Sequence, residues 1–238
     1  MHGENSLIRI TTERLFLRPV QLSDAAAIKE GASNFAIADT MISIPHPYPD
    51  EDYAEDFIRA KQEAAVQGKG VTFVMIERAS DEDLSYHDQL NHNHNQQQQQ
   101  QKQTASSSMS TSDGERLDDR SNDVPPSSPP FSSFVGVAEI RDIEVDEHSC
   151  QAEVSFWVTV DRWGKGYMSE AVRSVVKYGF TTLNLNRLYA YHMVRNPASG
   201  RVLEKNRFTK EGVLRQRVKK WNKYEDVAIW SILACDVM

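Results

Sequence analysis

The stretch VDRWGKGYMSEAV, Val160 to Val172, places two glycines one residue apart just before an amphipathic run. Upstream of it, CQAEVSFWVTV is rich in β-branched and aromatic residues, which favours a strand. Downstream of Gly166, apolar residues recur at i, i+3, i+4 and i+7, the spacing of a helix with one buried face. The glycines are therefore predicted to lie in a turn that leads from a strand into a helix.

This turn has the chemistry of an anion site. About four backbone N–H groups at the start of a helix have no intrahelical partner, and the positive end of the helix dipole lies behind them. Glycine permits positive φ and lets an anion approach the backbone, while Arg162 and Lys165 add positive charge. Neither a P-loop nor a dinucleotide motif fits, because Lys165 is followed by Gly166 and Ser169 stands at the position of the third glycine. A phosphate group of another ligand is expected here.

The segment 79–133 differs in composition from the rest of the chain. It has a six-glutamine tract, repeated Ser and Pro and hardly any aliphatic residues, so it is interpreted as a disordered insertion. It holds nine acidic and three basic residues, which leaves the remainder close to neutral although the whole chain has a net charge of −7. A near-neutral domain offers no broad basic surface, so no nucleic-acid partner is expected. The histidines of the insertion are interpreted as incidental, and no metal is expected.

Two separate cysteines, Cys150 and Cys235, form no C-x-x-C pattern, which favours a reducing compartment. The N-terminal residues lack the apolar core of a signal peptide, and no stretch approaches eighteen apolar residues. The sequence therefore predicts a soluble, cytoplasmic protein without a membrane partner.

The remaining segments alternate between strand and helix patterns. Strands are expected at 14–20, 71–77, 134–145, 151–160, 187–194, 208–218 and 226–237, and helices at 22–32, after Asp50, at 167–183 and after Asn196. Ser23 or Asp24, Asp50 and Asn196 are the expected N-caps, and the helix after Asp50 is expected to bury Tyr53, Phe57, Ile58 and Ala64. This order predicts an α/β fold with a mixed central sheet flanked by helices, in which the insertion replaces the turn of a β-hairpin.

Several ordered motifs in this sequence resemble the GNAT superfamily of acyl-CoA N-acyltransferases, in particular its RimJ/RimL-like branch. These motifs are TTERLFLRP, PYPDEDYAEDFI, the strand with Trp157 before WGKGYMSEA, and NPASGRVLEK. The resemblance covers nearly all of the chain outside the insertion. It implies a single GNAT domain over 8–238, interrupted at 79–133, that uses acetyl-CoA as co-substrate.

The resemblance also implies which residues hold the coenzyme. The backbone of the glycine turn would cradle the pyrophosphate, the end of the preceding strand would bind the pantetheine arm where the sheet splays, and the next helix would add two contacts. The residues concerned are Trp157, Val158, Thr159, Arg162, Trp163, Gly164, Lys165, Gly166, Tyr167, Met168, Asn196 and Ser199. Two positions depart from the family pattern. Asp161 would repel phosphate if it pointed inward, and Arg207 replaces a helix-ending glycine, so that either Asn206 is left-handed or the cap is strained.

Transfer of an acetyl group to an amine requires a neutral amine, and a positioned carboxylate is the usual base. Glu153 on the central strand is the first candidate, with an ion-paired strand residue as the alternative, and Glu139 and Ser155 are second candidates. A bulge in the strand would place Ser155 and Glu153 on different faces. The tyrosine that serves as acid in some family branches is replaced by Leu203, and backbone N–H groups near Trp157 and Val158 would stabilise the oxyanion.

The amine acceptor is the least defined part of the prediction. By resemblance, His46, Tyr48, Trp221 and Tyr224 flank its entrance, although such aromatic residues serve packing as often as recognition. We expect an N-acetyltransferase that acts by direct attack on a protein N-terminal α-amino group or a small-molecule amine, as a monomer or homodimer. The alternative is a non-catalytic acyl-CoA-binding module whose disordered loop recruits partners.

Overall fold

The computed structural model describes residues 8–78 and 133–237. The insertion predicted at 79–133 lies outside these residues except for Ser133, and its disorder stays a prediction. Within the described residues, none of the helices is long and apolar enough to cross a lipid bilayer.

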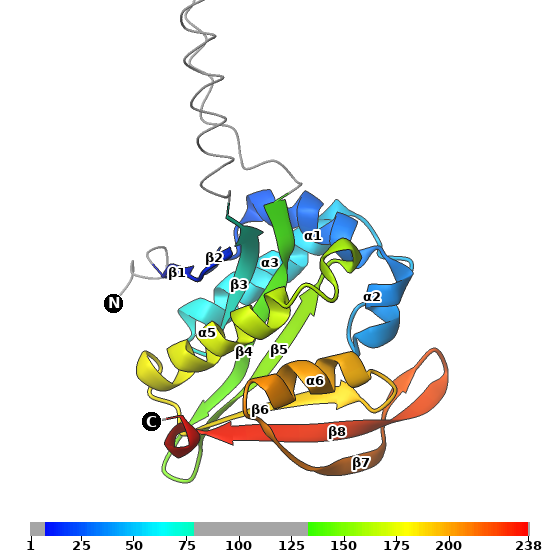
Figure 1. The fold of residues 1–238 in the computed structure, drawn as a ribbon. Coiled ribbons are helices and arrows are strands. Elements are labelled where there is room, and N and C mark those ends of the chain that lie inside the picture. Colours follow the sequence, from blue (N-terminus) through cyan, green and yellow to red (C-terminus); the bar gives the residue numbers. More distant parts are fainter. Residues whose placement is uncertain (1–7, 79–132, 238) are drawn as a thin grey trace, which may run out of the picture. The chain divides into compact units, whose positions relative to one another are not determined.

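Eight strands of the described residues form one sheet in the order β1-β2-β3-β4-β5-β6-β8-β7 (Figure 1). The strands are β1 Ile10–Thr11, β2 Leu15–Pro19, β3 Gly70–Glu77, β4 Phe134–Val145, β5 Cys150–Val158, β6 Arg187–Met193, β7 Thr209–Lys220 and β8 Lys223–Leu233. Only β5 and β6 pair in parallel, and all other neighbours are antiparallel. The predicted α/β fold with a mixed sheet is therefore confirmed.

Helices lie on both faces of the sheet. The helices α1 Ala25–Ala32, α2 Phe35–Thr40 and α3 Glu51–Val66 contribute to one buried cluster with Val74, Val137 and Trp157. The opposite face packs against α5 Tyr167–Thr181 and α6 Pro197–Lys205. The alternation of β3 explains the division, because Val74 faces the first group of helices while its neighbours Phe73 and Met75 face the second.

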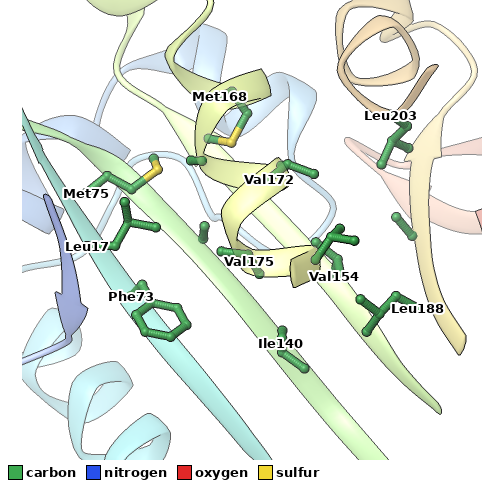
Figure 2. Close-up of a cluster of buried hydrophobic side chains, with 14 of the residues drawn as sticks. Leu17, Phe73, Met75, Ile140, Val154, Met168, Val172, Val175, Leu188 and Leu203 are labelled. Carbon is green, nitrogen blue, oxygen red and sulfur yellow. The ribbon is translucent and has the colours of Figure 1, made fainter. Parts of the chain in front are cut away.

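The larger core cluster confirms the helix pattern of the opening stretch. Met168, Val172 and Val175 on α5 are buried against Leu17, Phe73, Met75, Ile140, Val154 and Leu188 of the sheet, and Leu203 joins them from α6 (Figure 2). Burial of side chains of this size contributes roughly 1.5–3 kcal/mol each. This packing fixes the glycine turn, which directly precedes α5, against the middle of the sheet.

The local expectations for the first helices are only partly met. Asp50 caps α3 by accepting a hydrogen bond from the Tyr53 N–H at 2.9 Å, as predicted. Ile58 is buried as predicted, and Phe57 and Ala64 are half-buried, whereas Tyr53 is 43% exposed and Ala54 is buried in its place. Asp24 occupies the predicted cap position of α1 without capping it, because its carboxylate binds the Arg18 guanidinium at 2.7 and 2.8 Å.

Helix α6 ends in an unusual conformation. Asn206 has a φ of −100°, whereas Arg207 has a φ of 65° and takes the left-handed conformation itself. Of the two alternatives for this departure from the family pattern, the strained cap is the one found. A non-glycine residue in this conformation costs about 1–2 kcal/mol relative to the ordinary helical region.

Candidate functional site

The sheet opens between β5 and β6. The two strands pair at only three positions, the last of which is Glu153 with Tyr189. Beyond it, β5 stays paired with β4 as far as Val158, while β6 stays paired with β8 as far as Met193. The two strands therefore diverge, as Figure 1 shows, and the edge of β5 that faces β6 has no strand partner in the described part of the chain.

The glycine turn lies directly after this opening. Gly164 and Gly166 have φ values of 74° and 84°, and Gly166 occupies the N-cap position of α5. A Cβ at Gly164 would meet no atom within 4 Å, and one at Gly166 would meet only Arg14 Nη2 at 3.4 Å. The left-handed backbone, rather than close packing, is thus the reason for glycine at both positions.

The first turn of α5 presents free donors. Its first backbone hydrogen bond runs from the Glu170 N–H to the Gly166 carbonyl at 3.1 Å. No described residue accepts a backbone hydrogen bond from the N–H groups of Tyr167, Met168 or Ser169. These groups carry the positive partial charge of the helix N-terminus, so they can bind an anion without any side-chain rearrangement.

Glu170 fastens the turn to the N-terminal strand region. Its carboxylate accepts hydrogen bonds from the Thr12 hydroxyl at 2.5 Å and from the Arg14 N–H and Nε at 2.8 Å. Arg14 also donates to the Lys165 carbonyl at 2.9 Å and lies over the ring of Tyr167. Burial alone would raise the pKa of Glu170, but the bonds from Thr12 and Arg14 outweigh it and lower that pKa.

Glu77, the last residue of β3, binds the turn from its other side. It pairs with Arg162 at 2.9 Å and accepts a hydrogen bond from the Tyr167 hydroxyl, which together with burial raises the pKa of Tyr167. Asp161 is 68% exposed at its side chain and also pairs with Arg162, at 3.3 Å. Two carboxylates therefore offset the charge of Arg162, whereas Lys165 forms no ion pair with a described residue.

A cavity of about 400 Å³ lies between the glycine turn, the end of β5, α6 and α2. Ten of the twelve residues that the sequence assigned to coenzyme binding line it, and the two that do not are Thr159 and Lys165. The lining residues that sequence reasoning missed are Ile37, Thr40, Met41, Phe156, Ser169, Ala198, Arg201, Val202 and Lys205. The spacing of Ala198, Arg201, Val202 and Lys205 marks one face of α6 and is the signal that was available for them.

Asn196 and Ser199 reach this cavity from the start of α6. Asn196 is 8% exposed and caps the helix by accepting from the Ser199 N–H at 3.4 Å. Its amide donates to the Ser199 hydroxyl oxygen at 2.9 Å and to the Thr40 carbonyl at 3.5 Å. The hydroxyl proton of Ser199 is thereby directed away from Asn196, since the oxygen already accepts that bond.

Glu153 lies at the point where β5 and β6 part, with 9% of its surface exposed. Arg141, opposite it on β4, donates to its carboxylate at 2.5 Å. Burial raises the pKa of Glu153 more than Arg141 lowers it, and the nearby Asp142 and Glu139 raise it further. The ion pair considered as the alternative is present, and Glu153 does not line the 400 Å³ cavity.

The two second candidates lie beside it. Glu139 is 6% exposed and accepts from the Thr72 hydroxyl at 2.9 Å and from Lys61 at 3.0 Å, so its charge is offset. Ser155 faces Glu139 across the β4–β5 ladder. That ladder is regular from Gly136 to Arg141, so the bulge considered for β5 is absent from this stretch and Ser155 shares the face of Glu153.

The residues proposed for the acceptor entrance separate into two groups. Phe35, on the unpredicted helix α2, contacts His46 at a ring distance of 5.1 Å and Trp221 at 5.8 Å. Tyr48 is 9% exposed and packs against Tyr53, and burial raises its pKa to about 12. Tyr224 is 60% exposed, and its ring lies 5.8 Å from Lys219 Nζ. The structure thus brings His46 and Trp221 together and leaves Tyr48 and Tyr224 apart from them.

Ion pairs hold this aromatic cluster in place. Asp39 of α2 binds the Arg195 guanidinium and the Trp221 indole N–H, each at 2.8 Å, and Arg195 also pairs with Glu225 at 3.3 Å. Lys220 is 7% exposed and donates to the Ile44 carbonyl at 2.6 Å. These contacts join α2 to the β7–β8 hairpin on one side of the opening.

His192 has a structural role. It is 8% exposed, accepts from the Trp230 indole at 3.0 Å and lies 2.9 Å from the Met193 carbonyl, which assigns its proton to Nδ1. Burial lowers its pKa and keeps it neutral. Among the described residues, no group of three or more His, Cys, Asp and Glu side chains is placed to hold a metal.

Comparison with known families explains why the opening and the turn occur together. The family model for the acetyltransferase (GNAT) domain matches residues 14–209. The chain belongs to the GNAT family. Members of this family are acetyltransferases that use acetyl-CoA, and the predicted resemblance is confirmed.

Individual relatives are similar over part or all of the chain. The uncharacterized N-acetyltransferase p20 of Bacillus licheniformis is 39% identical over 89 residues, which are 37% of this chain and 50% of that protein. The chain spans about half the length of the curated relatives it matches. The ribosomal-protein-S5-alanine acetyltransferase of Vibrio fischeri has the same fold, with a TM-score of 0.67, 16% identity and coverage of 97% and 99% of the two chains. Spermidine N-acetyltransferase of Vibrio cholerae, solved with CoA and spermine, also has this fold. Its TM-score is 0.63 and its sequence identity is 18%, and the match covers 94% of this chain and 98% of that chain.

Proposed function

We propose that the protein is an acetyl-CoA-dependent N-acetyltransferase that transfers the acetyl group directly to a primary amine. The observation that carries this proposal is the opening of the sheet between β5 and β6 immediately before the glycine turn. It provides two binding surfaces for one extended ligand: the unpaired edge of a strand and the N-terminus of a helix. Membership of the GNAT family supports the same assignment.

The residues present fit the coenzyme. Its pyrophosphate would accept hydrogen bonds from the free N–H groups of Tyr167, Met168 and Ser169, and Lys165 would add positive charge. The unpaired edge of β5 up to Val158 would bind the pantetheine arm through the backbone, as an added strand would. Acetyl-CoA supplies an acyl group that is activated as a thioester.

Glu153 is the base that we favour. An amine must lose a proton before it attacks, and an α-amino group with a pKa near 8 requires less help than a lysine with a pKa near 10.4. The raised pKa of Glu153 makes it a stronger base than an exposed glutamate. Backbone N–H groups near Trp157 and Val158 would stabilise the negative charge that develops on the carbonyl oxygen.

For the acceptor, we propose a protein N-terminal α-amino group, with a small-molecule amine such as a polyamine as the competing possibility. The exposed rings of Phe35 and Trp221 beside His46 offer an apolar contact for a side chain next to the amine. The structural relatives support both classes, since one is named for a ribosomal-protein alanine and another for spermidine.

A second function is favoured by one observation. Glu153 is already bound by Arg141 and lies outside the 400 Å³ cavity, as expected if the chain binds acyl-CoA without catalysing transfer. Such a module would bind the coenzyme through the same strand edge and turn, and it would show no turnover with any amine.

Substitution of Glu153 by Gln separates these functions. Loss of a general base lowers the turnover number by about 10²–10⁴-fold, while coenzyme affinity should stay unchanged because Glu153 lies away from the turn. Glu139→Gln is the matched control, as it removes an equally buried carboxylate from the neighbouring strand. The readout is release of free thiol from acetyl-CoA together with calorimetric binding of CoA.

The pH dependence gives an independent check. A base acts in its deprotonated form, so turnover of the wild type should fall as the pH drops through the raised pKa of Glu153. This acid limb should vanish in Glu153→Gln and persist in Glu139→Gln. Equal loss of turnover in the two variants would remove Glu153 as the base, and absence of turnover in the wild type would favour the binding module.

A further inference from the structure

A second cavity, of about 840 Å³, lies at the other ends of α5 and α6. It is bounded by the last two turns of α5, the end of α6 and the segment from Ala234 to Val237. Lys205 lines both this cavity and the one at the glycine turn.

The floor of the cavity contains an unpaired acceptor. Val176, Leu185 and Asn206 all line the cavity and are buried, and Asn206 is 7% exposed. The Asn206 amide donates to the Val202 carbonyl at 2.9 Å, but its oxygen is buried without a hydrogen-bond partner among the described residues. A buried acceptor left unpaired is costly, and a rotation of the Asn206 side chain toward the cavity would let a donor in the cavity bind this oxygen.

The walls of the cavity carry four exposed cations. They are Arg173, Lys177, Lys205 and Arg207, and none of them forms an ion pair with a described carboxylate. No Asp or Glu lines the cavity. A favourable position at a helix C-terminus accounts for only one of the four, because Lys205 is the only basic residue in the last turn of either helix.

Arg207 lines this cavity with its backbone in an unfavourable conformation. Its φ of 65° is a conformation in which glycine would be more stable, and Asn184, another lining residue, has a φ of 54°. Strained residues of this kind concentrate at ligand sites, where the side chain contributes more than the backbone loses.

We propose that this second cavity binds a small organic polyanion that also carries a hydroxyl or another hydrogen-bond donor. The four cations would hold the anionic groups, the hydroxyl would donate to Asn206 Oδ1, and the apolar floor would contact the carbon skeleton. The site is separate from the glycine turn, so it should bind its ligand in the presence of CoA. This inference does not depend on the proposed acetyltransferase activity.

Citrate is a suitable probe because it has three carboxylates and one hydroxyl. Titration calorimetry of citrate into the full chain saturated with CoA, at low ionic strength, should show one bound citrate. The double variant Lys177→Gln, Arg207→Gly should bind citrate about tenfold more weakly, since two of the four cations are lost. Arg215→Gln, Arg217→Gln removes two charges from the exposed strand β7 and should leave the affinity unchanged.

Tricarballylate, which lacks only the hydroxyl of citrate, tests the proposed hydrogen bond to Asn206 Oδ1. Loss of the hydrogen bond to Asn206 should weaken binding about fivefold. The absence of saturable citrate binding, its displacement by CoA, or an equal loss in both double variants would overturn the proposal. Equal affinity for the two tricarboxylates would overturn the role given to Asn206.

Discussion

The two ends of helix α5 differ in which residues take the left-handed conformation and in whether the nearby cations are paired. At the N-terminal end the left-handed positions, Gly164 and Gly166, are glycines, whereas Asn184 and Arg207 take that conformation around the C-terminal end. At the N-terminal end, Glu170 forms an ion pair with Arg14 and Glu77 forms one with Arg162. At the C-terminal end, the cations that line the second cavity form no ion pair within the described residues.

This difference indicates which groups would bind an anion at each end if both proposals hold. Where backbone N–H groups are the donors, side-chain charges are better used to hold the turn in shape, and Glu77 and Glu170 do so. At a helix C-terminus no backbone N–H group is free, so an anion can be bound only by side chains. The variants below test this contrast, in order of decreasing effect.

Removal of the Glu170 carboxylate should give the largest change in stability. Glu170→Ala loses three hydrogen bonds from Thr12 and Arg14, and the free energy of unfolding should fall by about 2–3 kcal/mol. Glu55→Ala is the control, because Glu55 forms only an exposed pair with Arg59 and should cost less than about 0.5 kcal/mol. Urea unfolding measures both, and equal effects would contradict the role given to Glu170.

The loss of stability in Glu170→Ala should depend on pH. Because the pKa of Glu170 is lowered in the folded state, its stabilisation is present above the ordinary value of 4.5 and is lost as the pH falls below that value. The melting temperatures of the wild type and Glu170→Ala should therefore converge in acid. A difference that stays constant down to low pH would indicate that packing, not charge, is responsible.

A side chain at the glycine turn should have the next largest effect. Gly166→Ala puts a Cβ on a residue with a φ of 84° and should cost about 1–2 kcal/mol, with weaker binding of CoA. Gly212→Ala is a suitable control, since a Cβ there meets nothing within 4 Å and its φ lies outside the positive range. If Gly166→Ala binds CoA as tightly as the control, the turn is not the anion site.

Arg207→Gly should have the smallest effect and the opposite sign. Relief of the left-handed strain outweighs the extra entropy of the unfolded chain, and the free energy of unfolding should rise by about 1 kcal/mol. Thermal unfolding without added anions provides the measurement. A destabilised variant would show that the Arg207 side chain supports the fold itself rather than a ligand.

Features that depend on local sequence were predictable. The buried face of α5 and the caps Asp50 and Asn196 were found because each is set by residues within one or two turns. The contacts of Glu170 with Thr12 and Arg14 were not, since the partners are 158 and 156 residues apart. Phe35 was missed because α2 has only six residues, too few for a periodic pattern.

The motifs supplied by family resemblance led to the residues proposed to bind the coenzyme but not to their surroundings. They led to ten residues of the 400 Å³ cavity, while the pair of Glu153 with Arg141 emerged only from the strand register. Glu139 and Ser155 likewise became neighbours through that register. Whether a carboxylate is free or paired depends on such cross-strand contacts, which a single sequence does not specify.

The most direct test of the acetyltransferase proposal is mass spectrometry of amines incubated with the protein and acetyl-CoA. The panel should contain peptides with free N-termini, N-terminally blocked lysine peptides, spermidine and an aminoglycoside, with thiol release recorded in parallel. The account predicts one acetyl group on the α-amine of a peptide and an equal amount of released thiol. Binding of acetyl-CoA without acetylation of any amine in the panel would contradict it.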